Sequence, residues 1–529
     1  MSEGFDVAAA RTWLDALPGR HIGECVQQRW QQFGEIDVPV VTVYGSYDTG
    51  KSSLIRRILI ELGQAVPAWL TISARHETFE VNEIRAAGCL LRDTPGFVVD
   101  GTDARAQLNT ERATEAVVLT DVAIVTVPPQ LVTAELPALR QLLEQQWVPG
   151  SLWFVVSRFD EAGVDPEDDP EGYRDLAVRK TRELRSALSL GDTIPVHIVC
   201  PDFAQMAGAE RNPDPQVWND SRDWDGIVGL VQAITQLGAS DGSTLRRAAE
   251  ERFWRRAVQQ AHVELSEELE KQLDNAVVSD KGEERRQSWL AQLDTVTRAG
   301  EADLRGRASA VISDALDSPD PVQRFTTALK TSLGAWHAGC ERDIDKLLQS
   351  VGATIATERS RPDWQRFERL TEALRREPSE SDDEDELEVP LRYAPLVGQV
   401  GDAVLDALRY YEKTSRVKKP PPTTPPKFDR IQAAAAGIEL ATELGRIAER
   451  FIQRQRDTDQ AYAELQSDLS AAGQEAIALA LDDLHRLADN ARQRIVDSTA
   501  DQADLRESLH DMVGQLRNLI ASGQTLLRS

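Results

Sequence analysis

The chain has 529 residues, which is too long for one ordinary domain, so we expect two or three. Its formal net charge of −27 argues against a nucleic-acid partner, because phosphate binding needs a basic surface. The four cysteines are too far apart for a zinc site or a disulfide framework, so we expect a cytoplasmic location. We expect neither a signal peptide nor a membrane span, since no run of about 18 apolar residues occurs.

Residues 1–35 are expected to contain two helices between Phe5 and Phe33, broken at Pro18-Gly19. A Val-rich stretch from Val38 then indicates a buried strand. It runs directly into Gly45–Ser52, which reads GSYDTGKS. This sequence has the G-x-x-x-x-G-K-S pattern of a phosphate-binding loop.

The residue types of this loop match the chemistry of a bound nucleotide. Glycines let backbone N–H groups approach a polyphosphate. Lys51 reaches the β- and γ-phosphate oxygens, Ser52 ligates Mg²⁺, and a helix over Lys51–Leu62 points its positive end at the same phosphates. The alternative, a strand–helix turn that binds nothing, is disfavoured by the motifs downstream. The candidate binding residues here are Gly45, Ser46, Tyr47, Asp48, Thr49, Gly50, Lys51, Ser52 and Ser53.

A second motif follows the apolar run Gly88–Leu91, where the chain reads Asp93-Thr94-Pro95-Gly96. An aspartate at the end of a strand beside the phosphate loop holds Mg²⁺ through water, and the Gly96 N–H contacts a γ-phosphate. Further strands are expected at Asp121–Val127, Leu152–Val156 and Pro195–Val199, and helices at Ala134–Gln146, Glu171–Leu190 and Gly226–Leu237. This alternation predicts an α/β domain over residues 36–240, with a mostly parallel, doubly wound sheet.

From Thr244 on, strand patterns disappear and long helical stripes take over, so we expect an all-helical bundle or stalk over residues 241–529. An i, i+4 apolar line runs from Leu245 to Leu273, and Trp289 is expected to begin the next helix. Later helices are expected at Phe325–Ile355, Phe428–Phe451, Thr458–Val496 and Gln502–Leu527. An acidic loop at 377–389 and a Pro-rich linker at 413–427 interrupt them.

The choice between GTP and ATP depends on recognition of the base. A carboxylate at a strand end accepts both hydrogen bonds that the N1–H and amino group of guanine offer. The strand Leu152–Val156 is followed by Ser157-Arg158-Phe159-Asp160, so Asp160 is the expected guanine reader and Arg158 lies along the base. The motif is a degenerate form of the N/T-K-x-D sequence that GTPases carry at this place. Ser157 replaces Asn or Thr, and Arg158 replaces Lys.

The order of these motifs resembles the GTPase domain of the translation-factor-related class, over Val38 to Asp202. The sequence D-T-P-G-F with an all-helical remainder resembles dynamin-like GTPases, and the layout is similar to that of bacterial dynamin-like proteins linked to enterotoxin secretion and phage defence. The resemblance implies binding of GTP or GDP with Mg²⁺, hydrolysis, and a helical neck that pairs Phe5–Phe33 with the C-terminal helices. It also implies a homodimer through the GTPase domain.

The same resemblance implies roles for single residues. Thr78 is the switch threonine that closes on Mg²⁺ and the γ-phosphate, with Thr71 and Ser73 as competitors, and Cys200 begins the last loop beside the base. The expected metal ligands are therefore Ser52, Thr78 and Asp93, and the expected catalytic residues are Lys51, Thr78 and Asp48.

Two positions depart from the small GTPases. Phe97 stands where they have a water-orienting glutamine, so hydrolysis must position water differently. Asp48 stands where cation-activated GTPases help to hold K⁺ or Na⁺, a charge that replaces an arginine finger. The other interpretation of Asp48 is a turn residue that caps the loop.

A membrane contact is conceivable at Leu391–Lys419, where apolar and aromatic residues are followed by basic ones. We favour an ordinary core helix and its linker, because Asp402 and Asp406 interrupt the stretch and an acidic loop precedes it. Two functions remain: a self-assembling mechanochemical GTPase, peripheral to membranes in one version, or a soluble GTP switch whose helical domain binds a protein, as in antiviral defence. A third possible function is that of an ATPase.

Overall fold

The computed structural model describes residues 5–18, 21–72, 80–97, 104–130, 135–375 and 458–528, and the single positions 404, 405 and 408. The chain divides into two compact units. Among the longer described ranges, the first unit holds the residues up to Glu268 and those from Leu516 onward. The second unit holds the residues between them, from Leu269 to Gln515.

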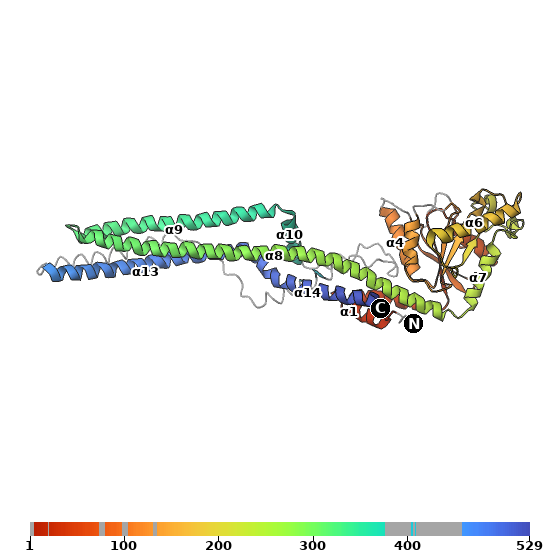
Figure 1. Cartoon of the computed structure of the whole chain (residues 1–529), viewed down its shortest axis with the longest axis horizontal. Coiled ribbons are helices and arrows are strands. Elements are labelled where there is room, and N and C mark those ends of the chain that lie inside the picture. The colour runs from red at the N-terminus through yellow and green to blue at the C-terminus, as the bar shows by residue number, and fades with distance from the viewer. Residues whose placement is uncertain are drawn as a thin grey trace. The chain divides into compact units, whose positions relative to one another are not determined.

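The first unit contains the sheet whose strands are drawn as arrows in Figure 1. The sheet has six strands in the order β2-β3-β1-β4-β5-β6. Its strands are β1 (Val40–Gly45), β2 (Asn82–Ala86), β3 (Cys89–Asp93), β4 (Val122–Val127), β5 (Leu152–Val156) and β6 (Val196–Ile198). β2 is antiparallel to β3, and all other neighbours are parallel. The mostly parallel sheet is confirmed, whereas the antiparallel edge strand β2 was not predicted.

Helices cover both faces of this sheet. On one face α3 (Lys51–Glu61) and α7 (Ile227–Ala239) pack against side chains of β1 such as Val41 and Val43. On the other face α4 (Ala104–Val118), α5 (Leu136–Leu143) and α6 (Pro170–Leu188) pack around Tyr44 and Phe154. Since successive strand residues point to opposite faces, the continuous apolar runs of β1, β4 and β5 fill two cores at once.

The N-terminal helices α1 (Val7–Asp15) and α2 (His21–Gly34) belong to the same unit, with the beginning of α8 (Ser243–Leu316) and the end of α14 (Ala500–Arg528). The Trp13 indole of α1 donates from Nε1 to the Leu519 carbonyl and the Ser522 hydroxyl of α14, both at 3.0 Å. Arg255 of α8 donates to the Leu527 carbonyl at 3.1 Å, and its guanidinium lies over the Phe5 ring. Helices from three parts of the sequence therefore form one neck.

Arg246 fixes the start of α8 to the sheet. Its guanidinium forms two contacts of 2.8 Å with the Asp121 carboxylate and donates to the carbonyls of Phe33, Ile36 and Val38. The same carboxylate accepts the Val40 N–H at the beginning of β1, at 2.8 Å. Such a planar fork satisfies several acceptors at once, so the first turn of α8 is fixed to the end of the sheet opposite the phosphate loop.

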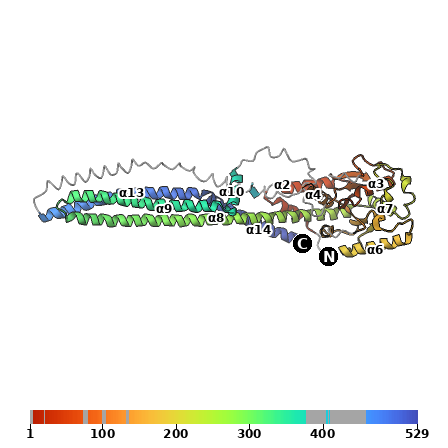
Figure 2. The ribbon, with the colours of Figure 1, turned by 90° about the horizontal axis from the view of Figure 1, so that it is seen from above.

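α8 is one helix of 74 residues, so the expectation that a new helix begins at Trp289 is wrong. Its i, i+4 apolar line drifts round the helix, so the apolar pattern ends in the sequence although the helix continues. In the second unit α9 (Pro321–Arg359) and α13 (Thr458–Ser498) lie along α8 (Figure 2), and their shared core includes Trp289, Trp336 and Leu484. A further helix, α10 (Pro362–Arg375), was not predicted.

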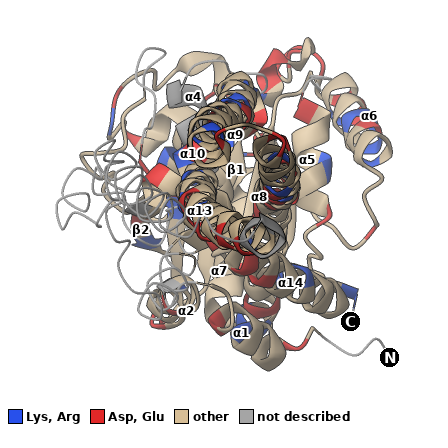
Figure 3. Ribbon diagram, turned by 90° about the vertical axis from the view of Figure 1, so that its left-hand side faces the viewer, with Lys and Arg blue, Asp and Glu red and all other residues tan. Residues whose placement is uncertain are grey.

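Both acidic and basic residues occur on the helices (Figure 3), as in the exposed i, i+4 pair of Asp303 and Arg307 on α8. No helix among the described residues is long and apolar enough to cross a membrane. The acidic loop at 377–389, nearly all of Leu391–Lys419, the linker at 413–427 and the helix Phe428–Phe451 lie outside the described residues. The domain boundaries at 36–240 and 241–529 stay predictions.

The neck gives a stability prediction. A Cβ atom at Gly523 of α14 would lie 2.6 Å from Cζ2 of Trp13, so we expect Gly523→Ala to overpack the α1–α14 contact and to cost about 1–3 kcal/mol. Its thermal unfolding midpoint should fall. Gly514→Ala in the same helix is the control, because nothing lies within 4 Å of that Cβ and alanine favours a helix. Equal midpoints for the two variants would contradict this packing.

Candidate functional site

The phosphate loop joins β1 to α3 at the carboxyl edge of the sheet, and close packing fixes its shape. A Cβ atom at Gly45 would lie 2.2 Å from Oγ1 of Thr126, and Gly50 has a left-handed φ of 78°. The Thr49 hydroxyl donates to the Ser46 carbonyl at 2.9 Å and lies 2.8 Å from the Thr126 hydroxyl. Glycine is thus required at both positions, one for space and one for backbone conformation.

Lys51 lies inside this loop. Its ammonium donates to the carbonyls of Gly45 and Ser46, at 3.1 and 2.7 Å. Burial lowers the pKa of Lys51 to about 8, against the opposing effect of the Asp93, Asp48 and Glu135 carboxylates. A buried cation surrounded by loop carbonyls is available to bind a polyphosphate.

Ser52 and Asp93 form the candidate metal site. The Ser52 hydroxyl donates to Oδ2 of Asp93 at 3.0 Å, while Oδ1 of Asp93 is buried without a hydrogen-bond partner among the described residues. Burial raises the pKa of Asp93 to about 6, although Lys51 and Ser52 lower it. A hydroxyl and an unsatisfied buried carboxylate oxygen fit a hard divalent cation such as Mg²⁺, whose charge favours the ionised carboxylate.

The segment after Asp93 packs directly on the phosphate loop. The N–H of Tyr47 donates to the Phe97 carbonyl at 3.2 Å, and a Cβ atom at Gly96 would lie 2.7 Å from Cα of Tyr47. The Phe97 side chain is buried and stacks on Tyr44 with ring centroids 5.0 Å apart. Phe97 therefore belongs to the core beneath the loop and carries no group that orients water.

Arg158 connects the phosphate loop with the motif after β5. Its guanidinium donates to the Asp48 carbonyl and pairs with the Asp48 carboxylate, both at 3.0 Å, and it also pairs with Glu161. Asp48 itself has a left-handed φ of 62°. A Cβ atom at Gly50 would lie 3.2 Å from the Ser157 hydroxyl, so a small residue suits position 157.

Asp160 lies in a 3₁₀ turn, Phe159–Ala162, and its Oδ2 accepts the Ala204 N–H at 3.3 Å. The thiol of Cys200 is buried, and both burial and the neighbouring Asp160 charge raise its pKa. Cys200 therefore stays a neutral thiol. The structure brings the 157–160 motif and the loop after β6 together, and their role in binding a base stays a prediction.

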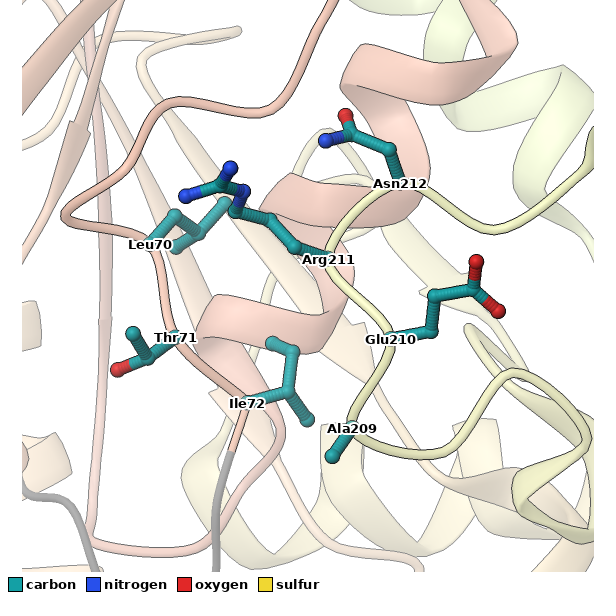
Figure 4. Close-up of a pocket in the computed structure, with 7 residues that line it drawn as sticks. All are labelled: Leu70, Thr71, Ile72, Ala209, Glu210, Arg211 and Asn212. Atoms are coloured by element: carbon teal, nitrogen blue, oxygen red, sulfur yellow. The ribbon is translucent and has the colours of Figure 1, made fainter.

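Other predicted residues lie around this centre. The Ser46 hydroxyl donates to Glu135 at 2.5 Å, Tyr47 is 46% exposed, and Ser53 follows Ser52 in the first turn of α3. Thr78 and its competitor Ser73 lie outside the described residues. The other competitor, Thr71, lines an open cavity of about 550 Å³ (Figure 4). The cavity is lined by Leu70, Thr71, Ile72, Ala209, Glu210, Arg211 and Asn212.

Two residues of this region were missed from the sequence: Arg56 and Arg57 of α3, whose side chains are fully buried. Arg56 pairs with Asp202 at 3.0 Å, and Arg57 pairs with Asp225 at 2.8 Å. In the sequence they read as the solvent face of an amphipathic helix. The segment that covers them, between β6 and α7, has no periodic pattern that could have revealed this contact.

Residues 40–157 match the family model described as 50S ribosome-binding GTPase, so this part of the chain is a P-loop GTPase domain. No curated protein matches the chain in sequence.

Among solved structures, LeoA, a bacterial dynamin GTPase from ETEC, aligns at 14% identity with a TM-score of 0.30, over 98% of this chain and 96% of that one. A structure described as an oligomerised bacterial dynamin pair that senses and tethers membranes aligns at 10% identity with a TM-score of 0.40, over 99% of this chain and 96% of its own. Toc33 from Arabidopsis thaliana aligns at 13% identity with a TM-score of 0.26, over 43% of this chain and 95% of its own.

The burial of Lys51 predicts that replacing it will lower nucleotide affinity without lowering stability against unfolding. Lys51→Met removes the cation that binds the phosphates, so we expect nucleotide affinity to fall about 100-fold or more. Because the buried ammonium is costly to desolvate, the nucleotide-free variant should unfold at the same temperature as the wild type or higher. Lys180→Met, at a pair between the half-buried Lys180 and the exposed Glu183 on α6, should change neither quantity. Unchanged nucleotide affinity in Lys51→Met would contradict the assignment.

Proposed function

We propose that the chain binds GTP with Mg²⁺ and hydrolyses it, and that it works as a dynamin-like GTPase whose helices respond to the nucleotide. The observation that carries the proposal is the arrangement at one edge of the sheet. The phosphate loop, the Ser52–Asp93 pair and the Asp160 loop follow three parallel strands, β1, β3 and β5. The family match over residues 40–157 supports it.

Guanine specificity is assigned to Asp160. Its carboxylate accepts from N1–H and the amino group of guanine, whereas adenine offers no such pair of donors on that edge. Arg158, two residues before Asp160, contacts Asp48 of the phosphate loop. The base end and the phosphate end of the site are thus joined by one side chain.

Hydrolysis depends on stabilising charge on the transferred phosphoryl group. Lys51 supplies one positive charge, and Ser52, Asp93 and Thr78 are the proposed ligands of Mg²⁺, which neutralises charge on the β- and γ-phosphates when bound. Phe97 provides no water-orienting group, so the water is positioned by a second copy of the chain across the nucleotide face, where Tyr47 is exposed. K⁺ or Na⁺ at Asp48 is the other proposed aid, but the ion pair with Arg158 supports a structural role for Asp48.

The neck supports the dynamin-like part of the proposal. Trp13 joins α1 to the end of α14, Arg255 joins α8 to the same end, and Arg246 fixes α8 to the sheet. A change at the sheet therefore reaches three helices at once. The second candidate is a soluble cytoplasmic switch whose helices bind a protein, for example in defence against phage. The lack of an apolar spanning helix among the described residues is consistent with both candidates.

Exchange of one atom at Asp160 tests the choice of nucleotide. Xanthine carries a carbonyl where guanine carries an amino group, so Asp160→Asn should weaken GTP binding by about 10-fold or more and strengthen XTP binding. Dissociation constants for GTP, XTP and ATP measure this. Asp165→Asn, at an exposed residue of the same connection, is the control. If Asp160→Asn leaves the relative affinities for GTP, XTP and ATP unchanged, the ATPase interpretation is favoured.

Liposome co-sedimentation separates the two candidate functions. A membrane-acting protein should sediment with anionic vesicles when a non-hydrolysable GTP analogue is present, and less without it. Neutral vesicles serve as the control for charge. The absence of sedimentation in both nucleotide states would favour the soluble switch.

A further inference from the structure

Adjacent residues Arg56 and Arg57 are both buried in α3, the helix that begins at the phosphate loop. Neighbours in a helix point about 100° apart, so burial of both requires that one segment wraps around the helix. That segment is residues 199–226, between β6 and α7. Burying a guanidinium is costly unless it is paired and hydrogen-bonded, so the contacts of these two side chains report what they do.

Arg56 has three partners in the segment. It donates to the Gly208 and Glu210 carbonyls at 2.7 and 2.8 Å and pairs with Oδ2 of Asp202 at 3.0 Å. Oδ1 of Asp202 accepts in turn from the Ala207 N–H at 2.9 Å and the Trp218 indole at 3.1 Å. Both oxygens of Asp202 are therefore engaged within the protein, so Asp202 shapes the loop and does not read the base.

Arg57 holds the other end of the segment. It pairs with Asp225 and Glu61 at 2.8 and 2.9 Å, lies over the Trp218 ring at 4.2 Å from its centre, and donates to the Pro201 carbonyl at 3.4 Å. The Asp225 carbonyl accepts the Cys200 N–H at 2.9 Å. Two arginines of one helical turn thus fix the segment near its beginning, middle and end.

The segment needs this anchoring, because little regular structure supports it. It contains only two short 3₁₀ turns, Phe203–Gln205 and Pro215–Trp218, and both Ala204 and Gln205 have positive φ, at 50° and 58°. Non-glycine residues in that conformation persist only where their surroundings fix them. Ala204 is also the residue whose N–H donates to Asp160.

We infer that Arg56 and Arg57 are positioning residues for guanine recognition: through Asp202, Pro201 and Ala204 they fix the orientation of the Asp160 carboxylate relative to the phosphate loop. The inference rests on the proposed function. α3 then sets the distance between the two ends of the nucleotide site. Its first turn binds the phosphates, and its second turn positions the loop that contacts Asp160. Errors in that spacing reduce recognition of the base without touching the phosphates.

The test compares GTP with ITP, whose base lacks the amino group of guanine. The ratio of the ITP and GTP dissociation constants reports how well Asp160 meets that group. A charge-assisted hydrogen bond of this kind gives the wild type a ratio of about 10 or more. Arg56→Lys keeps the charge but not the planar fork that satisfies three acceptors, and Arg56→Gln removes the charge. Both variants should lower the ratio at least about fivefold, with affinity for ATP changed less than about twofold. Affinity for ITP should fall less than affinity for GTP, because ITP keeps only the N1–H contact with Asp160.

This ratio excludes a merely structural effect, because a smaller folded fraction weakens GTP and ITP binding equally. Arg246→Lys is the control: it alters a pair between the half-buried Arg246 and the buried Asp121 at the opposite end of the sheet, and it should lower the unfolding temperature without changing the ratio. If the Arg56 variants do not fold, Asp202→Asn replaces them. Its amide oxygen still accepts from Ala207 and Trp218, while the partner of Arg56 is lost.

The outcomes are distinct. A lower ratio in the Arg56 or Asp202 variants, with the ratio of Arg246→Lys unchanged, supports the positioning role. An unchanged ratio in folded Arg56 or Asp202 variants, or an equal fall in Arg246→Lys, overturns it. A wild type that binds GTP, ITP and ATP equally overturns the proposed function instead, whatever the variants do.

Discussion

The backbone around the phosphate loop is packed so closely that it leaves no room for a Cβ atom at Gly45 or Gly96. One contact joins the loop to β4 through Thr126, and the other joins it to the segment after β3 through Tyr47. Three neighbouring strands must therefore end at the same point. This constraint places Asp93 beside Ser52 and sends the Phe97 side chain into the core, so position 97 supplies no water-orienting group.

A second constraint is the placement of charge inside this unit. Lys51 and Asp93 are buried at the site with shifted pKa values, and a polyphosphate and a divalent cation relieve the cost of each. Arg56 and Arg57 are buried on the same helix but already have carboxylate partners. Of these four charges, Lys51 and Asp93, which are incompletely paired, belong to ligand binding, and the paired Arg56 and Arg57 belong to the architecture that surrounds it.

The sequence predicts the parts of the site that follow local rules. Continuous apolar runs give β1, β4 and β5 within two residues at either end, and the glycine spacing gives the phosphate loop. β2 escaped prediction because its residues, Asn82–Ala86, are largely polar at the sheet edge. The burial of Arg56 depends on contacts with residues about 150 positions later, which no local pattern contains. The sequence predicts two helices where the structure has the single helix α8, because the i, i+4 line of apolar residues drifts round the helix.

In the proposed function, a second copy of the chain completes the guanine-nucleotide site. Turnover of GTP and of ATP, each measured as specific activity over a range of protein concentrations, tests that claim most directly. GTP alone should be hydrolysed, and the specific activity for GTP should rise with protein concentration, because a second copy positions the water. Equal turnover of ATP, or a specific activity for GTP that stays constant across the range, would contradict it.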